Sequence, residues 1–198
     1  MIMRTPTTGM FRFQVGMTIT VPGAPGARAP SAAVRAADEA LATLYADHAR
    51  SLLRIAALLI WAGGITVAPD KVRGIAEEIV HEAFAAMHRE WRRLRDADRA
   101  LRYLRRAIVN GTRACVSSSR GDLTSDGSLL AALQRMPGPQ REALILRYYA
   151  DLPEPQAAAA MGVSTAAFRW HAARGMKALF SGGYTPTPQV RYPLGFPP

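Results

Sequence analysis

The sequence predicts an all-α protein of two small helical domains joined by a short flexible linker. Apolar residues recur at helical spacing over several segments, no segment alternates as strands do, and a polar Gly/Ser-rich stretch divides the helical ones. The 198 residues are enough for one or two such domains. We expect a disordered leader over 1–36, a first domain over 37–116, the linker over 117–128, a second domain over 129–181 and a disordered Pro/Gly-rich tail over 182–198.

The first domain is expected to contain three helices around one core. An amphipathic helix runs from Asp38 to Ala62 and stops at a glycine pair, after which a loop continues to Gly74. The second helix covers about Ile75 to Leu94, and the third covers about Asp98 to Cys115. The apolar face of the second helix consists of Ile79, Val80, Ala83, Phe84, Met87 and Trp91.

The third helix carries two opposite stripes. The inward stripe consists of Leu101, Leu104, Ile108, Thr112 and Cys115. The outward stripe is basic and consists of Arg99, Arg102, Arg106, Asn110 and Arg113. Such a stripe suits contact with a nucleic acid, or is simply a solvated helix face. Gly111 interrupts this helix at a cost of roughly 1 kcal/mol relative to alanine.

The second domain reads as a helix-turn-helix. Four helices are expected, at about 129–135, 139–149, 154–161 and 165–180. Between the last two, a small residue at Ala158 allows close crossing, Gly162 can adopt a positive φ, and Ser164 is a good N-cap.

The last helix also has two faces. Its inward face consists of Phe168, Ala172, Gly175 and Leu179. Its outward face consists of Ala166, Arg169, Trp170, Ala173, Arg174 and Lys177. An apolar inner stripe with a basic outer stripe is the pattern of a helix that reads the major groove. Burial of Trp170 against a neighbouring helix is the structural alternative.

Composition favours a nucleic-acid partner over an acidic protein. The net charge is +10, and arginine supplies nearly all of the basic excess because Lys71 and Lys177 are the only lysines. A GC-rich genome is another source of such an arginine bias. The single cysteine, Cys115, excludes an internal disulfide and fits a reducing cytoplasm. The longest apolar stretch, Ile55 to Ala62, is far too short to span a membrane, and no signal-peptide pattern follows the N-terminus.

Catalytic chemistry of the chain's own is not expected. There is no glycine-rich phosphate loop, no nucleophile–base pair and no paired acid/base carboxylates. The His81-Glu82 pair lacks the second histidine of a metalloprotease motif, since position 85 is Ala85. His81 and His88 share a helix face but have no third ligand, so no metal and no cofactor is predicted. Cys115 is expected to be a buried helix residue rather than a redox switch.

Both halves resemble one family. The segment AEEIVHEAFAAMHREWRRLRDADRALRYLRRAIVN, from Ala76 to Asn110, resembles region 2 of the extracytoplasmic-function (group 4) sigma factors of bacterial RNA polymerase. The segment MPGPQREALILRYYADLPEPQAAAAMGVSTAAFRWHAARGMKAL, from Met136, resembles their region 4. The resemblance covers about Asp38 to Leu179, is closest to the actinobacterial branch, and keeps the order of the two regions.

The resemblance implies three sets of contact residues. The core-polymerase set, which would meet the clamp helices of the largest subunit, is Glu77, Glu78, Ile79, Val80, His81, Glu82 and Phe84. The −10 set is Trp91, Arg92, Arg93, Arg102, Arg105, Arg106, Asn110 and Arg113. The −35 set is Arg169, Trp170, Ala173, Arg174 and Lys177. The glutamates of the first set are equally ordinary solubilising residues of an exposed helix.

The resemblance implies a cytoplasmic, nucleoid-associated sigma factor that directs promoter-specific initiation. Its partners would be core RNA polymerase, including the flap of the second-largest subunit, promoter DNA and an anti-sigma factor. The linker is short for the distance between the two promoter elements. Twelve extended residues span at most ~40 Å, whereas the elements lie about 50 Å apart at ~34 Å per DNA turn. A polymerase-bound regulator that does not initiate therefore stays open, as does a free-standing repressor, although the dimerisation heptads typical of the latter are missing. The leader and tail are long enough to bind another protein.

Overall fold

The computed structural model describes residues 32–65, 67–94, 96–118 and 128–181 of the chain. These residues form helices and no strand, which confirms the all-α prediction. The elements are α1 (Ala32–Ala62), α2 (Pro69–Leu94), α3 (Ala97–Ser118), α4 (Leu129–Gln134), α5 (Gly138–Leu144), the π-helical turn η1 (Ile145–Tyr149), α6 (Glu154–Met161) and α7 (Thr165–Ser181). Residues 1–31 of the expected leader, most of the expected linker and the expected tail over 182–198 lie outside the described residues.

Two helices begin earlier than their apolar periodicity indicates. α1 begins at Ala32, inside the segment expected to be disordered, because an alanine-rich first turn forms helix through intrinsic propensity without an apolar face. α2 begins at Pro69 rather than near Ile75. Proline is well suited to a first helical turn, Asp70 complements the helix dipole there, and Val72 is fully buried.

The end of α3 and the start of α4 also differ from the prediction. α3 continues to Ser118, two helical residues into the expected linker. At the other side of that segment, Ser128 is already the N-cap of α4, and its side chain accepts a hydrogen bond from the amide of Ala131 at 3.2 Å. Fewer residues therefore separate the helices than the sequence suggested.

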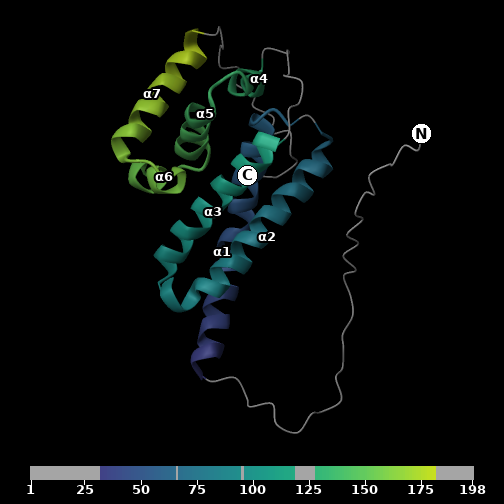
Figure 1. Cartoon of the computed structure of the whole chain (residues 1–198), viewed down its shortest axis with the longest axis vertical. Coiled ribbons are helices and arrows are strands. Elements are labelled where there is room, and N and C mark those ends of the chain that lie inside the picture. The colour runs from purple at the N-terminus through teal and green to yellow at the C-terminus, as the bar shows by residue number, and fades with distance from the viewer. Residues whose placement is uncertain (1–31, 66, 95, 119–127, 182–198) are drawn as a thin grey trace, which may run out of the picture.

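Helices α1, α2 and α3 pack lengthwise around the first core (Figure 1). Leu52, Ile60, Met87, Leu104 and Ile108 are almost completely buried there. These three helices, the first half of the chain, thus form a three-helix bundle. Its inward faces largely match the predicted apolar stripes.

Gly111 has a packing role in this bundle. A Cβ atom at this position would lie 2.9 Å from the Cγ2 of Ile79, a distance that real contacts do not reach. The prediction treated Gly111 as a weak point of α3; the structure shows that the missing side chain lets α3 approach α2 closely.

A second core joins this first half to the second half of the chain, which consists of α4, α5, η1, α6 and α7. It contains Phe168, Leu146 and other apolar residues of α4 to α7, together with Ile55 and Leu59 of α1 and Val109 of α3. Gln134 also donates a hydrogen bond across this contact to the carbonyl of Trp61 at 3.2 Å. In Figure 1 the α4–α7 group lies against the upper part of α1 and α3. Within the described residues, no helix is both long and apolar enough to cross a membrane.

Candidate nucleic-acid interface

The turn between α6 and α7 has the predicted geometry. Gly162 adopts φ +72°, in the left-handed region, and its amide bonds back to the carbonyls at the end of α6. Ser164 caps α7: its Oγ accepts from the amide of Ala167 at 3.2 Å, and its carbonyl accepts from the amide of Phe168 at 2.9 Å. Ala158 is buried beneath the crossing.

The two faces of α7 are those that the spacing indicated. Phe168, Gly175 and Leu179 are buried and Ala172 is half-buried. At Gly175 a Cβ atom would lie 3.0 Å from the side chain of Leu144, so glycine permits close contact between α7 and α5. The outward residues Ala166, Arg169, Trp170, Ala173, Arg174 and Lys177 are all exposed. The residues of the expected −35 set therefore share one exposed face of α7.

Trp170 is an exposed aromatic residue on this face. Its side chain is 55% exposed, which excludes burial against a neighbouring helix. The guanidinium of Arg174 lies over its ring at 4.9 Å from the ring centroid, and the ring of His171 meets it edge-on at 4.9 Å. The indole and the guanidinium thus form one composite surface with both stacking and cationic character.

Arg169 is held by a residue of the preceding helix. Its Nε lies 2.6 Å from the Oε2 of Glu154, the first residue of α6. Arg169 remains 67% exposed, so the pair orients the guanidinium without removing it from solvent. Sequence reasoning missed Glu154, because only the crossing of α6 and α7 brings residues fifteen positions apart together.

Comparison with known families bears on this half of the chain. Residues 126–179 match the family model described as Sigma-70, region 4. The matched segment contains α4, α5, η1, α6 and residues 165–179 of α7, and with them the whole of the outward face of α7. No curated protein matches the chain. The second half is therefore similar to the region of sigma factors that recognises −35 DNA, whereas the actinobacterial subgroup and the region 2 assignment gain no support from the comparison.

The −10 set divides between exposed side chains and side chains that bind the second half of the chain. Arg102, Arg106 and Asn110 of α3 are exposed, as is Arg93 of α2, whose guanidinium lies 3.2 Å from Glu90. Trp91 is half-buried against the first core. The side chain of Arg92 lies outside the described part of the structure.

Arg113 and Arg105 bind the second half. The guanidinium of Arg113 donates two hydrogen bonds to the carboxylate of Glu142 in α5, with Nε to Oε1 at 2.9 Å and Nη2 to Oε2 at 2.5 Å. Its Nη2 also donates to the carbonyl of Met161 at 3.2 Å. Arg105 donates from Nη1 to the Oε1 of Gln156 in α6 at 2.7 Å. The expected outward position of Arg113 is thus corrected: it is half-buried between the two halves.

Burial and charge act differently on these arginines. Hydrogen bonding to Glu142 raises the pKa of Arg113 and outweighs the opposing effect of burial. Desolvation lowers the pKa of Arg105, which has no carboxylate partner as close. Both guanidinium groups remain charged at neutral pH.

The core-polymerase set also divides between surface and core. Glu77, Glu78, His81 and Glu82 are exposed on α2, and Ile79 is half-buried. Val80 and Phe84 are buried, and the ring of Phe84 packs against Tyr45 with 5.0 Å between centroids. These two side chains hold α2 in the bundle and do not lie on a surface that a partner could touch.

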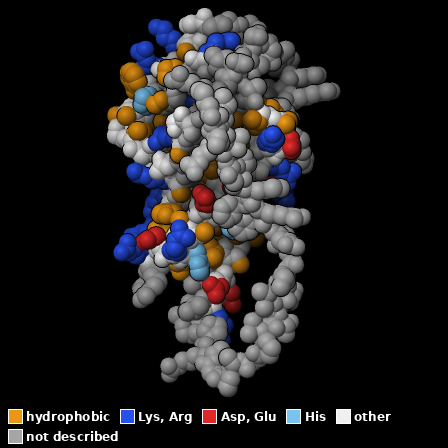
Figure 2. All heavy atoms as spheres, turned by 45° about the vertical axis from the view of Figure 1, so that its right-hand side comes forward, with side chains coloured by type: hydrophobic (Ala, Val, Ile, Leu, Met, Phe, Trp, Pro, Cys, Tyr) orange, Lys and Arg blue, Asp and Glu red, His pale blue; other side chains and the backbone are white. Residues whose placement is uncertain are grey.

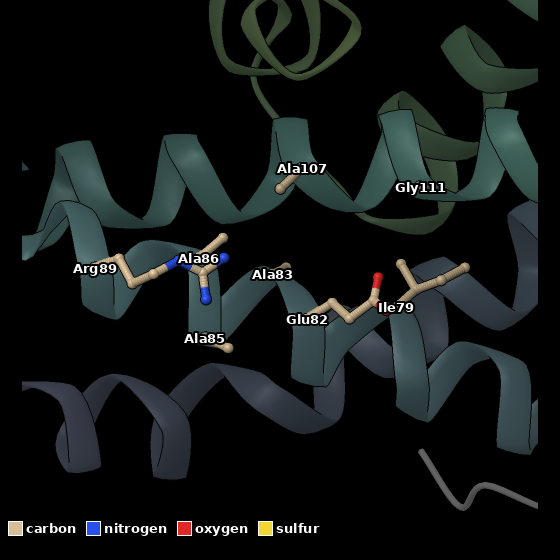
Figure 3. A pocket seen from close by; sticks show the side chains of 8 residues that line it. All are labelled: Ile79, Glu82, Ala83, Ala85, Ala86, Arg89, Ala107 and Gly111. Atoms are coloured by element: carbon tan, nitrogen blue, oxygen red, sulfur yellow. The ribbon is translucent and has the colours of Figure 1, made fainter. Parts of the chain in front are cut away.

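A groove of about 420 Å³ runs beside these exposed residues, between α2 and α3 (Figure 3). The lining residues are Ile79, Glu82, Ala83, Ala85, Ala86, Arg89, Ala107 and Gly111. In Figure 3 the guanidinium of Arg89 reaches Ala86, and Ala83 lies between it and Glu82. Small side chains therefore line most of this groove.

Most charged side chains on the surface of the described residues are basic. Figure 2 shows Lys and Arg side chains gathered along one edge of the molecule, with Asp and Glu side chains fewer on the same face. Among the described residues, no three His, Cys, Asp or Glu side chains are placed to hold a metal ion. The arrangement is suited to binding a polyanion.

Proposed function

We propose that the protein is a sigma factor of the extracytoplasmic-function type, which binds core RNA polymerase and directs promoter-specific initiation. The outward face of α7 would read −35 DNA through Arg169, Trp170, Ala173, Arg174 and Lys177. The observation that carries the proposal is this exposed basic face, on the second helix of a helix-turn-helix, inside the segment that matches Sigma-70, region 4.

In this proposal the first half supplies the −10 contacts and the polymerase contacts. Opening a promoter requires a cationic path for the strand and a place for an unstacked base. The exposed arginines of α3 and the half-buried Trp91 provide groups of that chemistry. The acidic face of α2 and the groove beside it would receive the clamp helices of the largest subunit, and the second half would meet the flap of the second-largest subunit.

Run-off transcription tests the proposal. The purified protein would be mixed with sigma-free core polymerase and a pool of genomic promoter fragments, and the 5′ ends of the RNA would be sequenced. We expect discrete starts that share two upstream motifs. The absence of starts from a protein that also fails to co-elute with core polymerase would overturn the proposal.

A second candidate is a polymerase-bound regulator that does not initiate by itself. The observation that favours it is the pairing of Arg113 and Arg105 with the second half, since these side chains are then not free for −10 DNA. Co-elution with core polymerase without transcription starts would select this candidate. An anti-sigma partner fits either candidate.

A further inference from the structure

We propose that Glu154 is a positioning residue for base reading by α7. Its carboxylate holds Arg169 by one side of the guanidinium, so that the opposite edge is presented to the major groove and selects guanine. Taking α7 as the helix that reads DNA rests on the proposed function. Glu154 itself lies on α6, outside every set of contact residues that the sequence indicated.

The ion pair leaves one edge of the Arg169 guanidinium available. A guanidinium carries five N–H donors in a fixed fork, and the Nε of Arg169 lies 2.6 Å from the Oε2 of Glu154. Two parallel donors match the O6 and N7 atoms of guanine, which accept side by side in the major groove. Because Nε is occupied, Nη1 and Nη2 are the pair of nitrogens that can form both of these bonds.

Arg169 lies where a reading helix meets bases. In helix-turn-helix proteins the N-terminal residues of the second helix contact base edges, and Arg169 is the fifth residue of α7. Its neighbours on the outward face, Ala166 and Ala173, are both exposed alanines. These small side chains leave room for the edge of a base beside the guanidinium.

The start of α6 is a rigid support for the carboxylate. Glu154 lies between Pro153 and Pro155, whose rings fix their own φ angles. The carbonyl of Pro153 accepts hydrogen bonds from the amides of Gln156 at 2.9 Å and Ala157 at 3.0 Å, and Ala157 is fully buried. A carboxylate on such a support orients its partner before DNA is bound, which lowers the entropy lost on binding.

The other basic residues of this face are held differently. Arg174 stacks over Trp170, and within the described part of the chain neither Arg174 nor Lys177 forms an ion pair. An exposed ion pair contributes little to folding stability. The main consequence of the pair between Glu154 and Arg169 is therefore the orientation of the guanidinium.

A carboxylate beside DNA has two opposite effects on binding. Its negative charge repels phosphates and weakens binding to every sequence, whereas the arginine that it orients binds the matching base more tightly. Loss of the charge should therefore weaken the preference for guanine, while binding to unrelated DNA stays equal or becomes tighter. A residue that only stabilised α6 would weaken both kinds of binding together.

Selection from randomised duplex DNA by the full-length protein tests the proposal. Bound duplexes would be sequenced, and Kd for the selected duplex and its single-base variants would be measured by fluorescence anisotropy at low salt. We expect one position at which guanine is preferred roughly tenfold, a usual discrimination for a bidentate arginine. Arg169→Ala should abolish that preference. No preferred guanine in the wild type, or one that survives Arg169→Ala, would overturn the proposal.

Glu154→Gln tests the positioning role. We expect the preference for guanine to fall to roughly threefold or less as the orientation is lost, with binding to a scrambled duplex unchanged or tighter. Asp151→Asn is the matched control: it removes the same charge at an exposed position three residues earlier, where asparagine tolerates the φ of 49°. It should leave the preference unchanged. Equal losses from the two variants would assign the effect to charge alone and overturn the positioning role.

A double-variant cycle tests whether Glu154 acts through Arg169. In an Arg169→Ala background, Glu154→Gln should leave the affinity for the selected duplex unchanged or higher, because the carboxylate then has no arginine to hold. A further loss of affinity would overturn the positioning role. These assays contain no polymerase. A guanine preference that depends on Glu154 would support the positioning role even if run-off transcription failed, and transcription starts would support the sigma factor even if Glu154 had no effect.

Discussion

Gly111 and Trp170 show how single side chains acquire a role from their neighbours. Its residue type marks Gly111 as a weak point of α3, yet a Cβ atom there would lie only 2.9 Å from the Cγ2 of Ile79. The spacing places Trp170 on the outward face of α7, and the structure shows it exposed to solvent with the guanidinium of Arg174 over its ring. In both cases a neighbouring side chain, Ile79 or Arg174, defines the surroundings of the residue.

Gly111→Ala is expected to destabilise the protein although alanine is the better helix former. The gain in helix propensity is roughly 1 kcal/mol, whereas overpacking a core contact costs about 1–3 kcal/mol. We therefore expect a small net loss in the free energy of unfolding, measured by urea denaturation. The double variant Gly111→Ala/Ile79→Ala removes the clashing methyl group and should show a smaller loss than the sum of the single changes. Strict additivity would contradict the contact.

Trp170→Ala should impair promoter recognition without affecting folding. A good base contact is worth about 1–3 kcal/mol, so we expect roughly a tenfold loss of transcription from a wild-type-selected promoter. The free energy of unfolding should change by less than about 0.5 kcal/mol because the side chain is exposed. Trp170→Phe, which keeps an aromatic face, should retain more activity. Full activity of Trp170→Ala would remove this residue from the −35 set.

At the scale of elements, caps and turns fix where the helices of the second half begin and end. Gly162 ends α6 in the left-handed region, and Ser164 starts α7 two residues later. The outward face of α7 is oriented by this turn, because the crossing of α6 and α7 is set by only three intervening residues. Ser128 performs the same capping role for α4.

Ser164→Ala should cost about 1 kcal/mol, the usual value of an N-cap hydrogen bond. Thermal unfolding followed by circular dichroism would measure it as a fall in Tm of about 2–4 °C. Ser181→Ala, at the exposed last residue of α7, provides a matched control and should leave Tm unchanged. Equal effects of the two substitutions would refute the capping role.

At the scale of the whole molecule, the two halves are coupled by a shared core. Leu59 of α1 is 3% exposed and belongs to the cluster of the second half, whereas Leu52, two turns earlier on the same helix, is 1% exposed and belongs to the first. One long helix thus contributes to both cores, so local stability in α5 and α6 depends on residues that are far away in sequence.

Leu59→Ala and Leu52→Ala separate the two cores experimentally. Each should lower the free energy of unfolding by about 2–5 kcal/mol. Native-state hydrogen exchange should show Leu59→Ala reducing protection in α5 and α6, and Leu52→Ala reducing it mainly in α2 and α3. If Leu59→Ala left the amides of α5 and α6 unchanged, the shared core would not hold in solution.

The sequence by itself determined the helices, the turn and the two faces of α7. These are local properties: periodicity selects the buried side, and Gly162 and Ser164 carry their conformational preferences in their own covalent structure. Helix starts at Ala32 and Pro69 were missed, because the first turns of α1 and α2 are set by propensity and by proline rather than by apolar spacing.

Only the tertiary structure decided which side chains of the candidate sites are free. Val80 and Phe84, which apolar spacing had already placed on the inward face of α2, are buried in the core, so the two assignments made for them from the sequence are decided in favour of the core. Arg113 is engaged because Glu142, twenty-nine positions along the chain, lies opposite it in the folded molecule. Periodicity assigns a residue to a face of its own helix, but the element that covers that face is set by the packing of the whole chain.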